Sequence, residues 1–510
     1  MGKSRMKNSF INSSVGTTIE IINNLINFGI RTIFIYYLSI DYLGLNGLFS
    51  NILELLNLAE LGFGTAITYN LYKPVADDDK ERIKSLVKLY KVIYRIIGLV
   101  VLLLGLSIIP FMGHIITETP NVSENIILIY ILFLAQIVGS YLYGYKRDIF
   151  LVYQKDYLNK LTDFVFNIIK AVIQIVILVF TQNYILYLLT FIVTTILSNV
   201  VISMMANRKY PFLKDKDVKN ISKEELKEIF NNVKSLLIYK LGTIIQNGTD
   251  NILLTILVSL TAVGVYSNYN TVILAVNKVL WALLTGLKGS IGNFNAKEDN
   301  ERKEEILLQV NFISSYLYGV ICVCLIVLLN PFVTIWIGEN YLFPIETVIL
   351  IVGCIYLRGI EFPMKAYRDT LGLFKEGRIA PLILAVLNII FSIVLGKMYG
   401  VPGIFLATIL SMCMTTMWYN PYILYKKRLG KSPKKYYMNS IYYLLCLVIV
   451  FVICYKVDQC MPLAGVFGFI IRCIVTFTLS NVIMLVLVHR KKEFKAVKGK
   501  VLNIWNRKGG

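Results

Sequence analysis

The sequence contains about fourteen apolar segments, each long enough to cross a lipid bilayer as a helix and separated from the next by a short polar gap. Only helices and closed barrels satisfy their backbone hydrogen bonds inside hydrocarbon, and segments of about 20 residues match the helical case. With 56% hydrophobic and 16% charged residues, the chain is also too apolar for a soluble globular protein. The prediction is an all-α polytopic membrane protein.

Basic residues gather in alternate gaps between these segments, for example in the gaps 73–91 and 146–160. The gaps that lie between the basic ones, such as 114–124 and 331–344, contain no Lys or Arg. The positive-inside rule therefore places the basic gaps, and with them both termini, in the cytoplasm. The same distribution accounts for the formal charge of +21 without a nucleic-acid partner, because the cations do not form a separate basic domain.

Two parts of the sequence resemble each other at one constant separation along the chain. This separation, which is the distance in sequence from Ala76 to Ala296, is called the repeat offset. The motif Ala-x-x-Asp-x-Glu-Arg follows the second apolar segment of each part, at Ala76, Asp79, Glu81 and Arg82 and again at Ala296, Asp299, Glu301 and Arg302. The repeat offset also pairs Asn27 with Asn247 and Gly44 with Gly264. Since six expected helices precede the longest internal gap, the second copy enters the membrane in the same orientation as the first. The chain is therefore predicted to be a duplication with two parallel six-helix repeats.

The expected organisation follows from this duplication. Residues 1–206 form an N-lobe with helices one to six, and residues 207–233 form a cytoplasmic linker. Ser222 and Glu225 in this linker have the spacing of a capping box at the start of an amphipathic helix. Residues 234–428 form a C-lobe with helices seven to twelve, and residues 429–510 add two extra helices and a basic cytoplasmic tail.

Polar residues recur within the apolar segments at steps of three or four, which places them on one helix face. The first segment carries Glu20, Asn27 and Arg31 in such a stripe, and its copy carries Lys240, Asn247 and Asp250. Further charges at membrane depth are Glu54, Asp163, Lys170, Lys278 and Arg358. For any one of them, an interhelical hydrogen bond or snorkelling to the interface is as good an explanation as function. The aligned set favours a shared polar cavity, because charges inside a membrane usually mark a pathway.

The sequence offers little for bond-making chemistry. Eight Cys lie between Cys322 and Cys473 without a Cys-x-x-Cys motif, and only two His are present. Neither a metal site nor a disulfide framework is indicated, and no cofactor or catalytic residue is expected. A membrane-embedded enzyme such as a polysaccharide polymerase is an alternative, but it would typically build its site in a large loop or domain, and the outer gaps here are short.

The chain resembles the polysaccharide repeat-unit flippases of the multidrug, oligosaccharidyl-lipid and polysaccharide exporter superfamily. The resemblance rests on the helix pattern and on residues 56–98, which read LNLAELGFGTAITYNLYKPVADDDKERIKSLVKLYKVIYRIIG, and it covers nearly the whole chain. It implies a transporter in the cytoplasmic membrane. The implied substrate is an undecaprenyl-diphosphate-linked oligosaccharide, which moves from the inner to the outer leaflet by alternating access of two lobes. Membrane lipids are the other expected partner.

The resemblance also suggests roles for individual residues. Arg31 and Lys278 match in kind the cavity cations that lipid II flippases of the superfamily use for the diphosphate. We expect both to contact the diphosphate. The further candidates for substrate binding are Asn27, Asn247, Lys170 and Arg358.

A second set of residues is expected to act in gating or ion coupling. Glu20 and Lys240 are equivalent at the repeat offset, and they carry opposite charge. We expect them to approach each other and close the inner gate, although each could instead snorkel to the inner headgroups or pair within its own lobe. Glu54 and Asp250 are further candidates, with a proton or a sodium ion as the possible coupling ion.

A drug and cation antiporter of the same superfamily is the main alternative among transporters. Such a protein would be expected to have more carboxylates than cations in its cavity. Here the membrane-depth cations Arg31, Lys170, Lys240, Lys278 and Arg358 outnumber the carboxylates Glu54, Asp163 and Asp250. This balance favours an anionic substrate.

Overall fold

The structure of the protein is a computed structural model. It describes residues 2–56, 64, 68, 70–116, 120–215, 218, 221–227, 229–230, 250–297, 299–371, 373, 379–461 and 465–508. Over these residues all regular secondary structure is helical, which confirms the predicted class.

Nine helices in the described part of the chain are long and apolar enough to cross a membrane. They span Lys80–Ile115, Ile126–Gly144, Tyr157–Phe180, Tyr184–Lys209, Asn300–Ile337, Ala380–Tyr399, Val401–Leu429, Lys434–Gln459 and Gly465–Val488. The chain is therefore a multi-pass membrane protein. The expected total of fourteen spanning helices stays a prediction.

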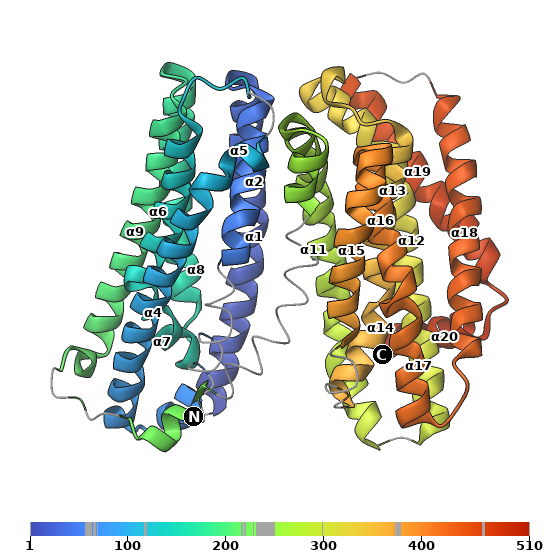
Figure 1. Cartoon of the computed structure of the whole chain (residues 1–510). Coiled ribbons are helices and arrows are strands. Elements are labelled where there is room, and N and C mark those ends of the chain that lie inside the picture. The colour runs from blue at the N-terminus through green and yellow to red at the C-terminus, as the bar shows by residue number, and fades with distance from the viewer. Residues whose placement is uncertain are drawn as a thin grey trace. The chain divides into compact units, whose positions relative to one another are not determined.

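The chain divides into two compact units, Met1–Gly264 and Val265–Gly510. The long helices of each unit run side by side (Figure 1). In the first unit, α1 packs on α8, α8 on α9, α9 on α6 and α6 on α4. Its helices are α1 (Gly2–Tyr37), α2 (Ile40–Leu56), α4 (Lys80–Ile108), α5 (Met112–Ile115), α6 (Ile126–Gly144), α7 (Arg147–Val152), α8 (Tyr157–Phe180) and α9 (Tyr184–Lys209), with short 3₁₀ turns at Ile109–Phe111 and Pro211–Lys214.

The second unit is built around α12 (Asn300–Ile337), which contacts α13, α18, α19 and α20. Tyr443 of α18 and Met484 of α19 pack with Phe312 and Val323 of α12 in one hydrophobic core. The other helices are α13 (Ile345–Ile360), α14 (Phe362–Thr370), α15 (Ile379–Tyr399), α16 (Val401–Met414), α17 (Thr416–Leu424), α18 (Lys434–Gln459), α19 (Gly465–Val488) and α20 (Lys492–Lys508). A 3₁₀ turn lies at Glu339–Tyr341 and a π-helical turn at Tyr425–Leu429. Helix α11 (Leu260–Lys297) begins in the first unit and continues into the second.

Helix starts in the two sequence copies follow the repeat offset. Helices α2 and α11 begin at Ile40 and Leu260, and α4 and α12 begin at Lys80 and Asn300. The Asp79 carboxylate accepts a hydrogen bond from the Arg82 backbone N–H at 2.9 Å, and Asp299 caps α12 through the Arg302 N–H at the same distance. The repeated acidic motif is thus a repeated helix N-cap, because an N-cap aspartate satisfies an otherwise unpaired N–H of the first turn.

A close helix approach inside the first unit follows the same repeat offset. A Cβ added to Gly44 in α2 would lie 2.4 Å from the carbonyl oxygen of Leu260, and one added to Gly264 would lie 2.6 Å from that of Ile40. The repeat offset relates the two glycines to each other, and it also relates the two facing residues. Glycine is required at both positions, because any side chain would overlap the facing backbone.

Candidate functional site

A polar pocket of about 290 Å³ lies in the first unit, among α1, α8, α9 and the first residue of α7. It is lined by amides, hydroxyls, two aromatic rings and three charged side chains: Asn23, Asn27, Arg147, Asp163, Phe166, Asn167, Lys170, Phe191, Thr194, Thr195 and Ser198. On α8 and α9 these residues follow one another at steps of one, three or four, so each helix turns a continuous polar and aromatic face toward the pocket.

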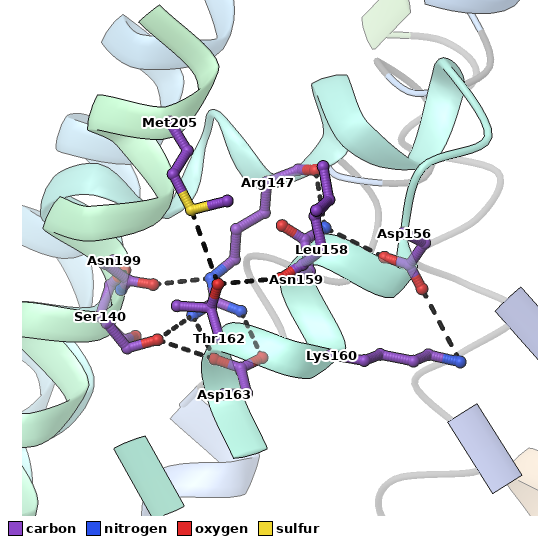
Figure 2. A network of polar contacts seen from close by, with 11 residues as sticks. Ser140, Arg147, Asp156, Leu158, Asn159, Lys160, Thr162, Asp163, Asn199 and Met205 are labelled. Carbon is purple, nitrogen blue, oxygen red and sulfur yellow. Dashed lines mark hydrogen bonds and ion pairs between the residues drawn. The ribbon is translucent and has the colours of Figure 1, made fainter. Parts of the chain in front are cut away.

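An ion pair between Arg147 of α7 and Asp163 of α8 forms one wall (Figure 2). Both terminal guanidinium nitrogens donate, Nη1 to Asp163 Oδ2 at 2.7 Å and Nη2 to Oδ1 at 2.8 Å. Ser198 of α9 donates a third hydrogen bond to this carboxylate, to its Oδ1 atom at 2.8 Å. This bidentate geometry fixes the relative orientation of the two side chains as well as neutralising their charge.

Two further hydrogen bonds hold Arg147, one at its side chain and one at its backbone. Its Nε donates to Asn199 Oδ1 at 2.6 Å, and the Asn199 amide donates to the backbone carbonyl of Ser140 in α6 at 2.9 Å. The Asn159 amide of α8 donates to the backbone carbonyl of Arg147 at 3.0 Å (Figure 2). The network therefore joins α6, α7, α8 and α9 around a single guanidinium group, and it restricts the positions that Arg147 can take.

Lys170 is the second cation of the pocket. Its Nζ lies 4.5 Å from the centre of the Phe191 ring, which is a cation–π contact. Among the described residues it forms no salt bridge. An ammonium group that is held over an aromatic ring inside a helical bundle, without a carboxylate, can bind an anion that enters the pocket.

Amide groups line the α1 side of the pocket. The Asn167 amide of α8 donates to Asn23 Oδ1 of α1 at 2.8 Å, and Asn27 lies one turn further along α1. Amides and hydroxyls both donate and accept hydrogen bonds, so they can recognise the hydroxyl groups of a sugar. Together with Lys170 and the Phe166 and Phe191 rings, the pocket can hold a polar ligand that carries an oxyanion.

The structure brings together two of the residues that the sequence nominated for substrate binding, Asn27 and Lys170. Arg31 lies one turn beyond Asn27 on α1, half-buried and near Tyr187 of α9, and it does not line the pocket. In the second unit, Lys278 lies exposed on α11 and Arg358 lies half-buried on α13. Asn247 lies outside the described residues.

The nominated gating residues are spread over the first unit. Glu20 of α1 and Glu54 of α2 have exposed side chains, and Asp250 is buried with 7% of its surface accessible. Lys240 lies outside the described residues, so the proposed Glu20–Lys240 contact stays a prediction.

Arg147 is the most highly connected of the pocket residues that the sequence did not nominate. The apolar segment ends just before Lys146 and Arg147, so the sequence assigns both residues to a cytoplasmic gap. The apolar residues Ile149–Val152 that follow at once are a usable signal, because an amphipathic turn next to a membrane helix tends to fold back onto it. Ile149, Phe150 and Val152 are indeed buried.

The charges of the pocket are not repeated in the second unit. At the repeat offset, the positions of Asp163 and Lys170 correspond to Ile383 and Ile390 of α15. The charged face of α8 therefore belongs to the first unit alone, although the helix framework is repeated.

Comparison with known proteins gives a family match for the sequence and similar solved structures for the fold. The family of polysaccharide biosynthesis proteins matches residues 9–287, which is more than half of the chain. No curated protein matches the sequence significantly. Among solved structures, the lipid II flippase MurJ in an inward closed conformation superposes with a TM-score of 0.63 at 16% identity, covering 93% of this chain and 98% of that one.

A multidrug resistance MATE family transporter of the MOP superfamily, in its inward-facing conformation, superposes with a TM-score of 0.59 at 15% identity. That alignment covers 80% of this chain and 96% of the transporter. At such low identity the two structures establish the fold, and the family match establishes the relationship. The chain belongs to the polysaccharide biosynthesis protein family, and its fold is that of the lipid II flippase and of the multidrug resistance transporter.

Proposed function

We propose that the protein flips undecaprenyl-diphosphate-linked oligosaccharide repeat units across the cytoplasmic membrane, for export of a cell-surface polysaccharide. The observation that carries this proposal is the first-unit pocket, where Lys170 lies over the Phe191 ring among amides and hydroxyls and pairs with no carboxylate in the described part of the chain. Family membership supports the same substrate class. The prenyl tail stays in lipid while the diphosphate and the sugars pass through the protein.

The physical need for such a pocket comes from desolvation. A diphosphate that crossed hydrocarbon without a counter-charge would lose its hydration at a cost of many kcal/mol. Charge-assisted hydrogen bonds from Lys or Arg replace that hydration, and amides and hydroxyls do the same for the sugar hydroxyls. A pocket with mixed lining of this kind suits a glycosylated diphosphate better than an apolar drug.

We propose the finer architecture that the sequence predicts: fourteen helices, with two parallel six-helix lobes at 1–206 and 234–428, a linker at 207–233 and two extra helices within 429–510. The helix starts and N-caps that recur at the repeat offset support this duplication. Alternating access of the two lobes would then expose the substrate first to the inner and then to the outer leaflet.

The residue roles are proposals of the same kind. Arg31 and Lys278 contact the diphosphate, and Asn27, Asn247, Lys170 and Arg358 contribute to the remaining substrate surface. Glu20, Lys240, Glu54 and Asp250 act in gating or in coupling to a proton or a sodium ion. Of these, Asn27 and Lys170 have the strongest support, because they line one pocket.

Both termini are proposed to be cytoplasmic, which cysteine labelling can test. In a variant that lacks the eight native Cys, a cysteine at Asn121, between α5 and α6, should react with a membrane-impermeant maleimide on intact cells. A cysteine at Lys219, in the proposed linker, should react only after the membrane is made permeable. External labelling at position 219 would contradict the topology.

Gene deletion tests the proposed function in the cell. Loss of the protein should cause one lipid-linked oligosaccharide to accumulate on the inner leaflet, because its synthesis continues while its exit is blocked. Mass spectrometry of extracted lipids would measure that species, and its sugar composition would identify the cargo. Unchanged surface polysaccharide without any accumulated lipid-linked sugar would contradict the proposal.

A further inference from the structure

The charge balance of the first-unit pocket depends on one ion pair. Three charged side chains line the pocket, the cations Arg147 and Lys170 and the carboxylate Asp163. Asp163 and Lys170 are seven residues apart on α8, which places them on the same helix face and about 10 Å apart along its axis. With no other partner, this carboxylate would attract the long, flexible Lys170 side chain, because opposite charges on one helix face attract each other.

In the structure, the Asp163 carboxylate binds Arg147 and Ser198 instead of Lys170. Arg147 binds both carboxylate oxygens, and Ser198 donates a further hydrogen bond to Oδ1. Asn199 holds the third guanidinium nitrogen at 2.6 Å. Lys170 is directed instead to the face of the Phe191 ring, at 4.5 Å from its centre. One cation therefore neutralises the carboxylate, and the other remains for a ligand.

We propose that Arg147 is a positioning residue that keeps Asp163 from capturing Lys170, and that Lys170 thereby forms an oxyanion subsite. This rests on the proposed function and deepens it. The oxyanion is either the diphosphate of the lipid carrier or the carboxylate of an acidic sugar in the repeat unit. Both offer a negatively charged oxygen to the ammonium group, and both bring polar groups for the surrounding amides and hydroxyls.

A double-mutant cycle separates this role from a purely structural one. Arg147→Met should weaken oxyanion binding about tenfold or more, because Asp163 then pairs with Lys170. Asp163→Asn should not weaken it, since both cations remain. The double variant Arg147→Met/Asp163→Asn should recover wild-type binding, because Lys170 has no carboxylate to pair with. If the pair only ties helices together, both single variants lose binding and the double variant does not recover it, which overturns the proposal.

The measurement uses the full-length protein in lipid nanodiscs, with binding followed by microscale thermophoresis at low ionic strength. The probes are undecaprenyl diphosphate, uncharged undecaprenol and glucuronic acid. Binding of the diphosphate that exceeds binding of undecaprenol and falls in Lys170→Met identifies the lipid carrier as the source of the oxyanion. Binding of glucuronic acid that falls in Lys170→Met identifies the sugar. If Lys170→Met lowers the binding of neither the diphosphate nor glucuronic acid, the proposed subsite is wrong.

Two controls complete the test. Lys160→Met changes a lysine on the same helix that lies beside Asp156 at 3.8 Å and does not line the pocket, and it should leave binding unchanged. If Arg147→Met is not recovered as a folded protein, Asp163→Asn and the double variant carry the test, because both keep Lys170 and lack the carboxylate. Loss of binding in either folded variant then overturns the proposal. The gene-deletion experiment tests the flippase function separately, because the binding measurements do not involve transport.

Discussion

Lys170→Met is expected to reduce polysaccharide export by about tenfold or more, while the amount of protein in the membrane stays unchanged. The substitution keeps an unbranched side chain of similar length, but it removes the ammonium group that lies over the Phe191 ring and that forms no salt bridge with the residues described by the structure. The diphosphate or acidic sugar would then leave water for the pocket without its counter-charge. Surface polysaccharide in a deletion strain that expresses the variant measures the effect.

Two variants act as controls for this prediction. Lys170→Arg keeps the charge and should retain part of the export, although the guanidinium group fits the ring and the pocket differently. Lys160→Met removes a lysine from the same helix outside the pocket and should leave export unaffected. Normal export by Lys170→Met at normal abundance would remove the first-unit pocket from the transport path.

The second large effect is expected from the two proposed diphosphate contacts. Arg31→Ala and Lys278→Ala should each abolish export, because a diphosphate carries more charge than one cation can neutralise. Arg31 lies one turn from the pocket residue Asn27, and Lys278 lies on α11 in the second unit. Export assays in the deletion strain, together with membrane abundance, measure the result. Full export by both single variants would exclude these residues from the mechanism.

Several features of the fold could be predicted from the sequence because they depend on local periodicity. Hydropathy predicted the nine helices that are long and apolar enough to span a membrane among the described residues, and the repeated Asp79 and Asp299 motif marked two helix N-caps that the structure contains. The spacing of polar residues on α8 and α1 likewise nominated Lys170 and Asn27. In each case the information lies within a few turns of one helix.

Other features of the site depend on contacts between distant parts of the chain. Arg147 pairs with Asp163 and Asn199, which are 16 and 52 residues away, only because α7 folds back against α8 and α9. Periodicity also assigned Arg31 to the same stripe as Asn27, but it could not show that the pocket ends before Arg31. Helix spacing predicts which residues share a face, whereas the extent of a pocket is set by the neighbouring helices.

The central claim, that this protein moves a lipid-linked oligosaccharide between leaflets, is tested most directly by reconstitution. The purified protein is placed in liposomes with the lipid-linked sugar recovered from the deletion strain, carrying a fluorescent label on the glycan. A membrane-impermeant quencher then reports the fraction that remains in the outer leaflet. We expect transfer between leaflets by the wild-type protein and by Lys160→Met, and little transfer by Lys170→Met. A folded wild-type protein that transfers no more substrate than protein-free liposomes would contradict it.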